Sequence, residues 1–129
     1  MTTEQMQTYK TELDNLAASI QAKANLIESK RQDEIAIDDE MQTLKMSEMM
    51  NVMTARFEVN NKLMYTNDDQ RKAALQAALD ANEDYQNLKS ARSVKIVERV
   101  LLESEVEFQR KSFRALELQM LYHANNPTT

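Results

Sequence analysis

The sequence predicts an all-α protein, built as a long antiparallel helical hairpin of the coiled-coil type with a short helix near the turn. Its 129 residues include no glycine, and the one proline is Pro127, so the chain holds almost no residue that breaks a helix. Apolar residues recur three and four positions apart over long stretches, as in a helix with an apolar seam. We expect one elongated helical domain over residues 1–129 that assembles into an oligomeric helical bundle.

A first helix is expected over residues 3–65. Its seam begins with Met6, Tyr9, Leu13, Leu16, Ile20 and Ile27. The seam weakens over residues 29–40, where Ser29 and Gln32 could form a capping box; a kink there is an open alternative, and a continuous helix is favoured. The seam then resumes at Ile37, Met41 and Leu44. We expect it to change phase after that, in a stutter, to Met46, Met50, Met53, Phe57 and Met64.

The chain is expected to turn back at residues 66–69, where short polar side chains compete for backbone hydrogen bonds. Asn67 with Gln70 three positions later is typical of a helix N-cap and predicts a short helix over 70–79. Residues 80–84 offer a second cap, with acidic side chains suited to a new helix N-terminus. A last helix is predicted over 83–123, followed by a frayed tail at 124–129.

The last helix carries two apolar sets. The first apolar set is expected to pack against the first helix and comprises Val94, Val97, Leu101, Phe108, Ala115, Leu118 and Tyr122. The second apolar set lies on a different face and comprises Leu102, Val106, Phe113, Leu116 and Met120. At about 25 cal/mol per Å² of apolar area, leaving such a set in water forgoes several kcal/mol. The second apolar set therefore predicts self-association into a homo-oligomer.

Methionines concentrate near the middle of the chain, where the segment that we call the methionine stretch holds Met46, Met49, Met50, Met53 and Phe57. Methionine is flexible and polarisable, so a methionine-rich surface adapts to partners of several shapes. The alternative interpretation is an ordinary bundle core that uses methionine as filler. The candidate protein interface consists of the methionine stretch and the second apolar set.

Composition argues against several kinds of chemistry. The chain has no cysteine and a single histidine, His123, so the usual thiolate and imidazole groups are nearly absent, and we expect neither an enzyme nor a cofactor. The acidic cluster at residues 33–40 lacks the glycine of a calcium loop, and no metal site is expected. No apolar run approaches the roughly 18 residues of a membrane span, which favours a soluble cytoplasmic protein without a membrane or small-molecule partner.

Charge is distributed unevenly along the chain, whose formal net charge is -5. The last helix carries two basic groups: Lys89, Arg92, Lys95 and Arg99, and then Arg110, Lys111 and Arg114. They allow two interpretations. Folding back would bring the first group opposite the acidic cluster at 33–40, where ion pairs favour one antiparallel register. Alternatively, both groups form a stripe that neutralises phosphates of single-stranded DNA.

Three helix-rich motifs carry a resemblance over residues 64–121: YTNDDQR at 65–71, LDANEDYQ at 79–86 and RKSFRALE at 110–117. This part of the chain resembles small coiled-coil proteins encoded by bacteriophages and prophages. The resemblance implies an accessory factor that assists another protein, in some cases within recombination or single-strand-binding gene clusters, and a location in the host cytoplasm. It implies no role for an individual residue.

These observations favour a non-enzymatic, oligomeric coiled-coil assembly or accessory protein that acts through helical surfaces. Its expected partners are further copies of itself and another protein. The main alternative is a recombination or single-stranded-DNA-binding accessory factor that uses the basic stripe. A weaker alternative is a secretion chaperone or export stalk, since acidic helical hairpins with adaptable apolar surfaces also suit unfolded clients.

Overall fold

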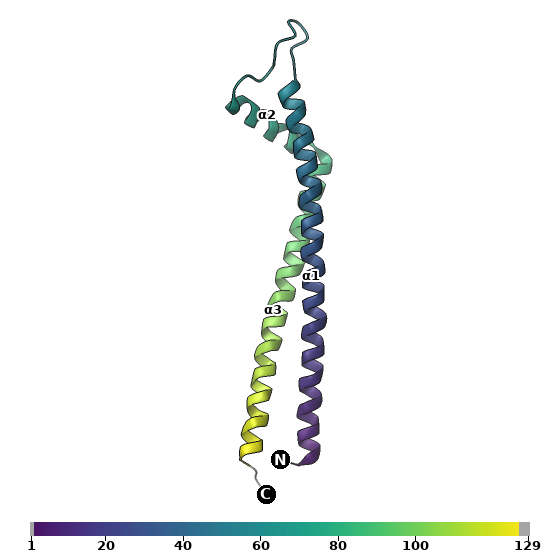
Figure 1. Ribbon diagram of the computed structural model, residues 1–129, viewed down its shortest axis with the longest axis vertical. Helices are drawn as coiled ribbons and strands as arrows, with labels where there is room; N and C mark the ends of the chain where they lie inside the picture. Colours follow the sequence, from purple (N-terminus) through teal and green to yellow (C-terminus); the bar gives the residue numbers. More distant parts are fainter. Residues whose placement is uncertain (1, 127–129) are drawn as a thin grey trace. The chain divides into compact units, whose positions relative to one another are not determined.

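The computed structural model describes residues 2–126, and these residues are mostly helical (Figure 1). The helices are α1 (Thr3–Thr54), α2 (Asp68–Ala81) and α3 (Glu83–Asn125). Residues 2–126 contain no strand and only one isolated antiparallel bridge, between Arg56 and Leu63. The prediction of an all-helical protein is therefore confirmed. Of the tail predicted at 124–129, Ala124 and Asn125 belong to α3 instead, and residues 127–129 lie outside the described part.

Contacts divide the chain into two compact units, each of which is described by itself. Unit 1 comprises the residues up to Arg31 and those from Val97 onward, and unit 2 is Gln32–Ile96. α1 and α3 contribute to both units, whereas α2 and the connection at 55–67 belong to unit 2.

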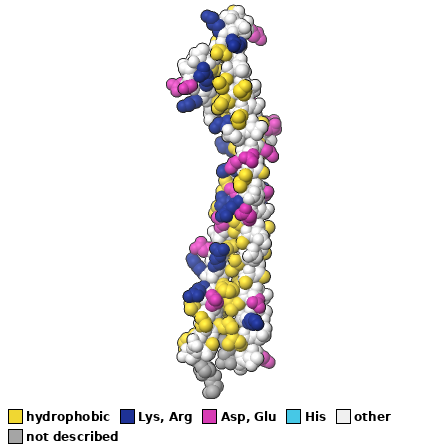
Figure 2. All heavy atoms as spheres, in the orientation of Figure 1, with side chains coloured by type: hydrophobic (Ala, Val, Ile, Leu, Met, Phe, Trp, Pro, Cys, Tyr) yellow, Lys and Arg dark blue, Asp and Glu magenta, His cyan; other side chains and the backbone are white. Residues whose placement is uncertain are grey.

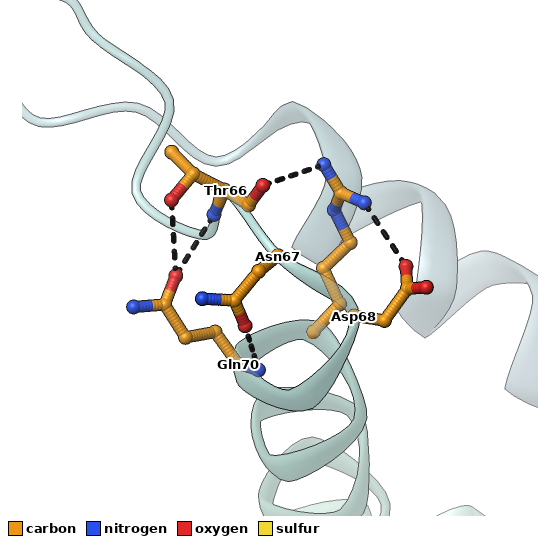
Figure 3. Close-up of polar contacts among 5 residues, drawn as sticks. Thr66, Asn67, Asp68 and Gln70 are labelled. Carbon is orange, nitrogen blue, oxygen red and sulfur yellow. Dashed lines mark hydrogen bonds and ion pairs between the residues drawn. The ribbon is translucent and has the colours of Figure 1, made fainter.

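Asparagine side chains begin α2 and α3: Asn67 as predicted, and Asn82 within the predicted cap segment 80–84. Asn67 Oδ1 accepts a hydrogen bond from the Gln70 backbone N–H at 2.8 Å, and Gln70 Oε1 accepts one from the Thr66 backbone N–H at 2.9 Å (Figure 3). At α3, Asn82 Oδ1 accepts from the Tyr85 backbone N–H at 2.9 Å. These bonds satisfy donors that have no partner within the helix. Both predicted N-caps are confirmed, and α2 is longer than predicted at each end.

The predicted end of the first helix at residue 65 is wrong, because α1 ends at Thr54. A tight reversal follows, in which Phe57 N–H donates to the Lys62 carbonyl at 2.9 Å. Asn61 has a φ of 54°, in the left-handed region that asparagine tolerates better than most residues. Asn60 Oδ1 accepts from the Lys62 backbone N–H at 3.1 Å. The consecutive asparagines favour a turn, although the apolar residues on either side of them follow helical spacing.

In unit 1, the start of α1 and the end of α3 lie side by side and antiparallel (Figure 1). The contacts are Tyr9 to Gln119, Ser19 to Gln109, Lys23 to Glu105 and Lys30 to Glu98. From one pair to the next, the residue number increases along α1 by as much as it decreases along α3. The pairing therefore keeps one register from Tyr9 to Lys30.

The seam predicted for the N-terminal half of α1 is the less exposed face of that helix in unit 1. Ile27 is buried at 8% exposure, and the other predicted members are partly buried: Met6, Tyr9, Leu13, Leu16 and Ile20. On α3 the buried apolar residue is Val106, at 4% exposure. Apolar burial in unit 1 thus follows a single narrow seam, as in a two-helix coiled coil.

Ion pairs lie beside this seam, and Glu103 takes part in two of them. Glu103 Oε1 lies 3.0 Å from Arg99 Nη1 and 3.1 Å from Arg31 Nη2. The hydrogen bond from Arg99 is the largest cause of a lowered pKa of Glu103. Desolvation opposes it, and the Arg99 charge and the Arg31 contacts lower the pKa further. Glu103 therefore links a helix-internal pair to a pair between α1 and α3.

In unit 2, acidic residues of α1 meet basic residues of α3. Asp33 Oδ2 lies 3.3 Å from Lys95 Nζ, and Asp38 Oδ1 accepts from Arg92 Nε at 2.6 Å. The prediction that the acidic cluster lies opposite the first basic group is confirmed for these two pairs. α1 continues through residues 29–40 without interruption, so the favoured continuous helix is also found.

We expect Asn67→Ala to lower the free energy of unfolding by about 1 kcal/mol, because the Gln70 backbone N–H loses its acceptor. Asn67→Asp keeps an acceptor oxygen and serves as the matched control. Urea unfolding followed by circular dichroism measures both variants. An equal loss in the two, or no loss in Asn67→Ala, would contradict a stabilising role of the acceptor oxygen.

We expect the stabilising effect of Glu103 to depend on pH. Its folded-state pKa is lowered, so the effect is present above the usual glutamate range of about 4.3 and is lost as the pH falls through the folded-state value. The unfolding free energy of the protein should therefore exceed that of Glu103→Gln at neutral pH, and the difference should shrink in acid. Glu12→Gln is the control, since Glu12 forms no ion pair among residues 2–126. A difference that does not change as the solution is acidified would contradict this account.

Candidate interaction surfaces

The two apolar sets of α3 lie on the opposite sides from those predicted: the set expected to be exposed faces inward, and the set expected to face α1 is exposed. The second apolar set, expected to be a free interface, faces the interior of unit 1, where Val106 is buried and the other members are partly buried: Leu102, Phe113, Leu116 and Met120. The first apolar set, expected to face α1, is exposed instead. In unit 1 the exposed fractions are 58% for Val97, 60% for Leu101, 70% for Phe108, 51% for Leu118 and 64% for Tyr122. Ala115 is exposed as well, and Val94, in unit 2, is 54% exposed.

Polar partners decide which set faces α1. Both sets follow heptad spacing, so the apolar pattern alone does not rank them. Gln109 lies on the same face as the second set and donates from Nε2 to Ser19 Oγ at 2.9 Å. Lys23 and Lys30 are seven residues apart, as are their partners Glu105 and Glu98. This matched spacing is the signal from which the facing side could have been predicted.

The exposed heptad positions of α3 in unit 1 form a continuous surface that we call the outer stripe. Its members are Val97, Leu101, Ser104, Phe108, Lys111, Ala115, Leu118 and Tyr122, and every one of them is exposed. They alternate at intervals of four and three residues, which places them along one side of the helix. On the face drawn in Figure 2, hydrophobic side chains reach the surface among charged ones. An apolar stripe of this length on a helix is typical of a protein interface.

The methionine stretch lies outside the core of unit 2. Its exposed fractions are 59% for Met46, 42% for Met49, 61% for Met50, 51% for Met53 and 46% for Phe57. The predicted change of seam phase to Met46, Met50, Met53 and Phe57 is wrong, because burial on α1 continues instead through the partly buried Met41, Leu44 and Glu48 to Val52, which is 7% exposed. Met64, the last residue of the predicted seam, is partly buried but lies beyond the end of α1. The seam shifts by a single position at Val52, and the methionines stay on the outer side.

A groove connects the methionine stretch to α2. It measures about 270 Å³ and is lined by Met49, Val52, Met53, Leu75, Asp68, Arg71 and Lys72. Its lining combines apolar side chains of α1 and α2 with three charged side chains of α2, so an adaptable apolar surface and charged groups share one groove.

Carboxylates neutralise most residues of the basic groups. Besides the pairs of Arg92 and Lys95, Arg99 meets Glu103, Lys111 Nζ lies 3.6 Å from Glu107 Oε1, and Arg114 Nη1 lies 3.8 Å from Glu117 Oε1. Arg110 lines a hollow with Ile27 and Val106. The basic residues thus carry much of the ion pairing of α3, and the pairs of Arg92 and Lys95 reach across to α1.

Lys89 has different surroundings. It lines a hollow of about 330 Å³ in unit 2 together with Lys45 and Lys72, and the three lysines come from α3, α1 and α2. Among the described residues none of the three forms an ion pair, and Asp80 is the carboxylate that shares the hollow. We call this group the lysine hollow. Of these three lysines, the sequence predicts only Lys89 as a binding residue, since no local spacing links lysines on three separate helices.

The imidazole of His123 contacts two tyrosine rings of unit 1, with centroid distances of 6.3 Å to Tyr9 and 5.5 Å to Tyr122. Within residues 2–126, no three histidine, aspartate or glutamate side chains are grouped so that they could hold a metal ion. No helix in that part of the chain has the length and apolar character needed to cross a membrane.

Comparison with known proteins gives no relative from which a role could be transferred. No protein-family model, no curated protein and no solved structure matches this chain.

Proposed function

We propose that this protein is a non-enzymatic assembly or accessory protein that forms a homo-oligomeric helical bundle. The observation that carries the proposal is the outer stripe, in which Leu101, Phe108 and Tyr122 are 60%, 70% and 64% exposed. Burying a large apolar side chain contributes about 1.5–3 kcal/mol, so covering several half-exposed ones contributes several kcal/mol. An oligomer stabilises the chain by an amount comparable to the total stability of a small domain.

The second surface of this function is the methionine stretch with its groove, which we assign to a different protein. Methionine side chains are flexible, and two of them line the groove together with charged residues of α2, so this surface suits an amphipathic helix of a partner.

We expect Leu101→Glu combined with Phe108→Glu to dissociate the oligomer, because two carboxylates would be buried at the centre of the outer stripe. Ala18→Glu with Ala22→Glu introduces equal charge at exposed positions of α1 in the same unit and is the control. Light scattering coupled to size exclusion measures the mass. A monomeric parent protein, or a stripe variant with unchanged mass and helix content, would refute self-association through this surface.

The lysine hollow supports a second candidate function, the binding of single-stranded DNA by an accessory factor. Three lysines and one aspartate line this hollow, so its net positive charge can attract phosphates, whereas Arg92, Lys95 and Arg99 already have carboxylate partners. Binding of this kind is electrostatic and only weakly dependent on base sequence.

If this second function holds, replacing Lys45, Lys72 and Lys89 with glutamine should weaken binding and reduce the slope of log affinity against log salt by about 2, since each phosphate contact on a single strand contributes about 0.7. The control replaces Arg92, Lys95 and Arg99 with glutamine and should change the slope less. Fluorescence anisotropy of a labelled oligonucleotide at about 50 and 200 mM salt makes the measurement. No binding by the parent protein would exclude this function, and an equal loss in both variants would exclude the hollow as its site.

A further inference from the structure

We propose that two copies of the chain pair through their outer stripes in antiparallel orientation, with Phe108 of each copy opposite Lys111 of the other. This inference rests on the proposed function, because it specifies how self-association takes place. The occupant of the outer stripe is thus a second copy of the same stripe, related by a two-fold axis.

Heptad positions follow from the spacing of the outer stripe. Positions a are Leu101, Phe108, Ala115 and Tyr122, and positions d are Val97, Ser104, Lys111 and Leu118. In a parallel pair each d residue meets its own copy, so two Lys111 ammonium groups would face each other in the seam. Like charges at that position oppose association. The parallel arrangement is therefore disfavoured by a residue at the centre of the stripe.

In an antiparallel pair each a residue meets a d residue of the other copy. With Phe108 opposite the second copy's Lys111, Leu101 meets Leu118, Val97 meets Tyr122, and Ser104 meets the small Ala115. The ammonium group of Lys111, whose side chain is 77% exposed, can then lie over the aromatic ring of Phe108, a favourable cation–π contact. Each layer thus pairs two apolar side chains, two small side chains, or a cation with an aromatic ring.

Charges beside the seam select the same register. It brings Glu107 opposite Arg114 of the second copy, and symmetry repeats the pair. The two side chains are 71% and 70% exposed, so both can reach across. Beside them, Val100 and Leu121, which are 49% and 56% exposed, meet in a further apolar contact.

The neighbouring antiparallel registers place like charges together. With Ser104 opposite the second copy's Phe108, Glu107 faces Glu107 and Glu105 faces Glu105. With Ala115 opposite the second copy's Lys111, Arg114 faces Arg114. Repulsion of this kind penalises both shifts, so charge gives the pairing its specificity as well as part of its affinity.

Engineered cysteines test the orientation cleanly, because the chain has no cysteine of its own. Leu101→Cys with Leu118→Cys should form a covalent dimer under mild oxidation, whereas Leu101→Cys alone should not. The two positions are 17 residues apart on one helix, or about 25 Å, which is too far for a bond within one copy. Ala22→Cys, on an exposed part of α1, reports collisional cross-linking.

A covalent dimer from Leu101→Cys alone, above the level of the collision control, would overturn the inference in favour of parallel pairing. An oligomeric parent with no covalent dimer from the double variant would overturn the inference and leave the proposed function standing. A monomeric parent would overturn both. These outcomes are read from non-reducing gels beside the mass of the parent protein in solution.

A charge exchange tests the register without cysteines. Glu107→Arg should raise the dissociation constant of self-association about tenfold, since two attractive pairs become repulsive. Adding Arg114→Glu to the same chain restores both pairs with opposite polarity and should return the dissociation constant to near its original value. Failure of the second substitution to rescue the first, with helix content unchanged, would overturn this register.

Discussion

Complementary charge between α1 and α3 is the constraint on which the structure of each unit depends. In unit 1, α1 is basic at Lys23 and Lys30 and faces acidic residues of α3, whereas in unit 2 its acidic residues face Arg92 and Lys95. Sliding one helix by a heptad would move Asp33 from Lys95 to an apolar leucine, either Leu88 or Leu102. Each exposed pair contributes at most about 1 kcal/mol, so the register depends on the set of pairs acting together.

Charge has this importance because the helices bury little apolar surface. Among the described residues, only Ile27, Val52, Leu79 and Val106 are buried hydrophobic residues, with exposures from 4% to 8%. A two-helix seam cannot enclose more, since each helix offers one narrow side to the other. The apolar residues left outside are then available for association, and their positions along α3 are set by the same ion pairs that choose its inner face.

Helix starts could be predicted from the sequence, because a single capping side chain determines each of them. Asn67 begins α2 as expected, and Asn82 supplies the cap expected within residues 80–84, because a capping side chain bonds to the backbone three residues later and needs no other part of the chain. The end of α1 at Thr54 was missed for the opposite reason: Phe57 and Met64 continue a plausible helical spacing, and Asn60 and Asn61 override it. The inner face of α3 was also missed, since two heptad patterns of similar quality share one helix and only the positions of Lys23, Lys30 and Ser19 on α1 distinguish them. The lysine hollow depends on three helices meeting, which no spacing within one segment reports.

The two faces of α3 also bear on how this helix can change over evolutionary time. An ordinary surface helix has one constrained side and a broad side on which substitutions are nearly neutral. α3 contributes Val106 and Gln109 to the inner seam and Leu101 and Phe108 to the outer stripe, on different sides of the helix. If the outer stripe pairs as proposed, α3 is constrained on two sides, and it should accept fewer substitutions per residue than the part of α1 that lies in unit 1. In a set of diverging sequences, the slowly changing positions of α3 would trace two parallel lines along the helix, and those of early α1 a single line.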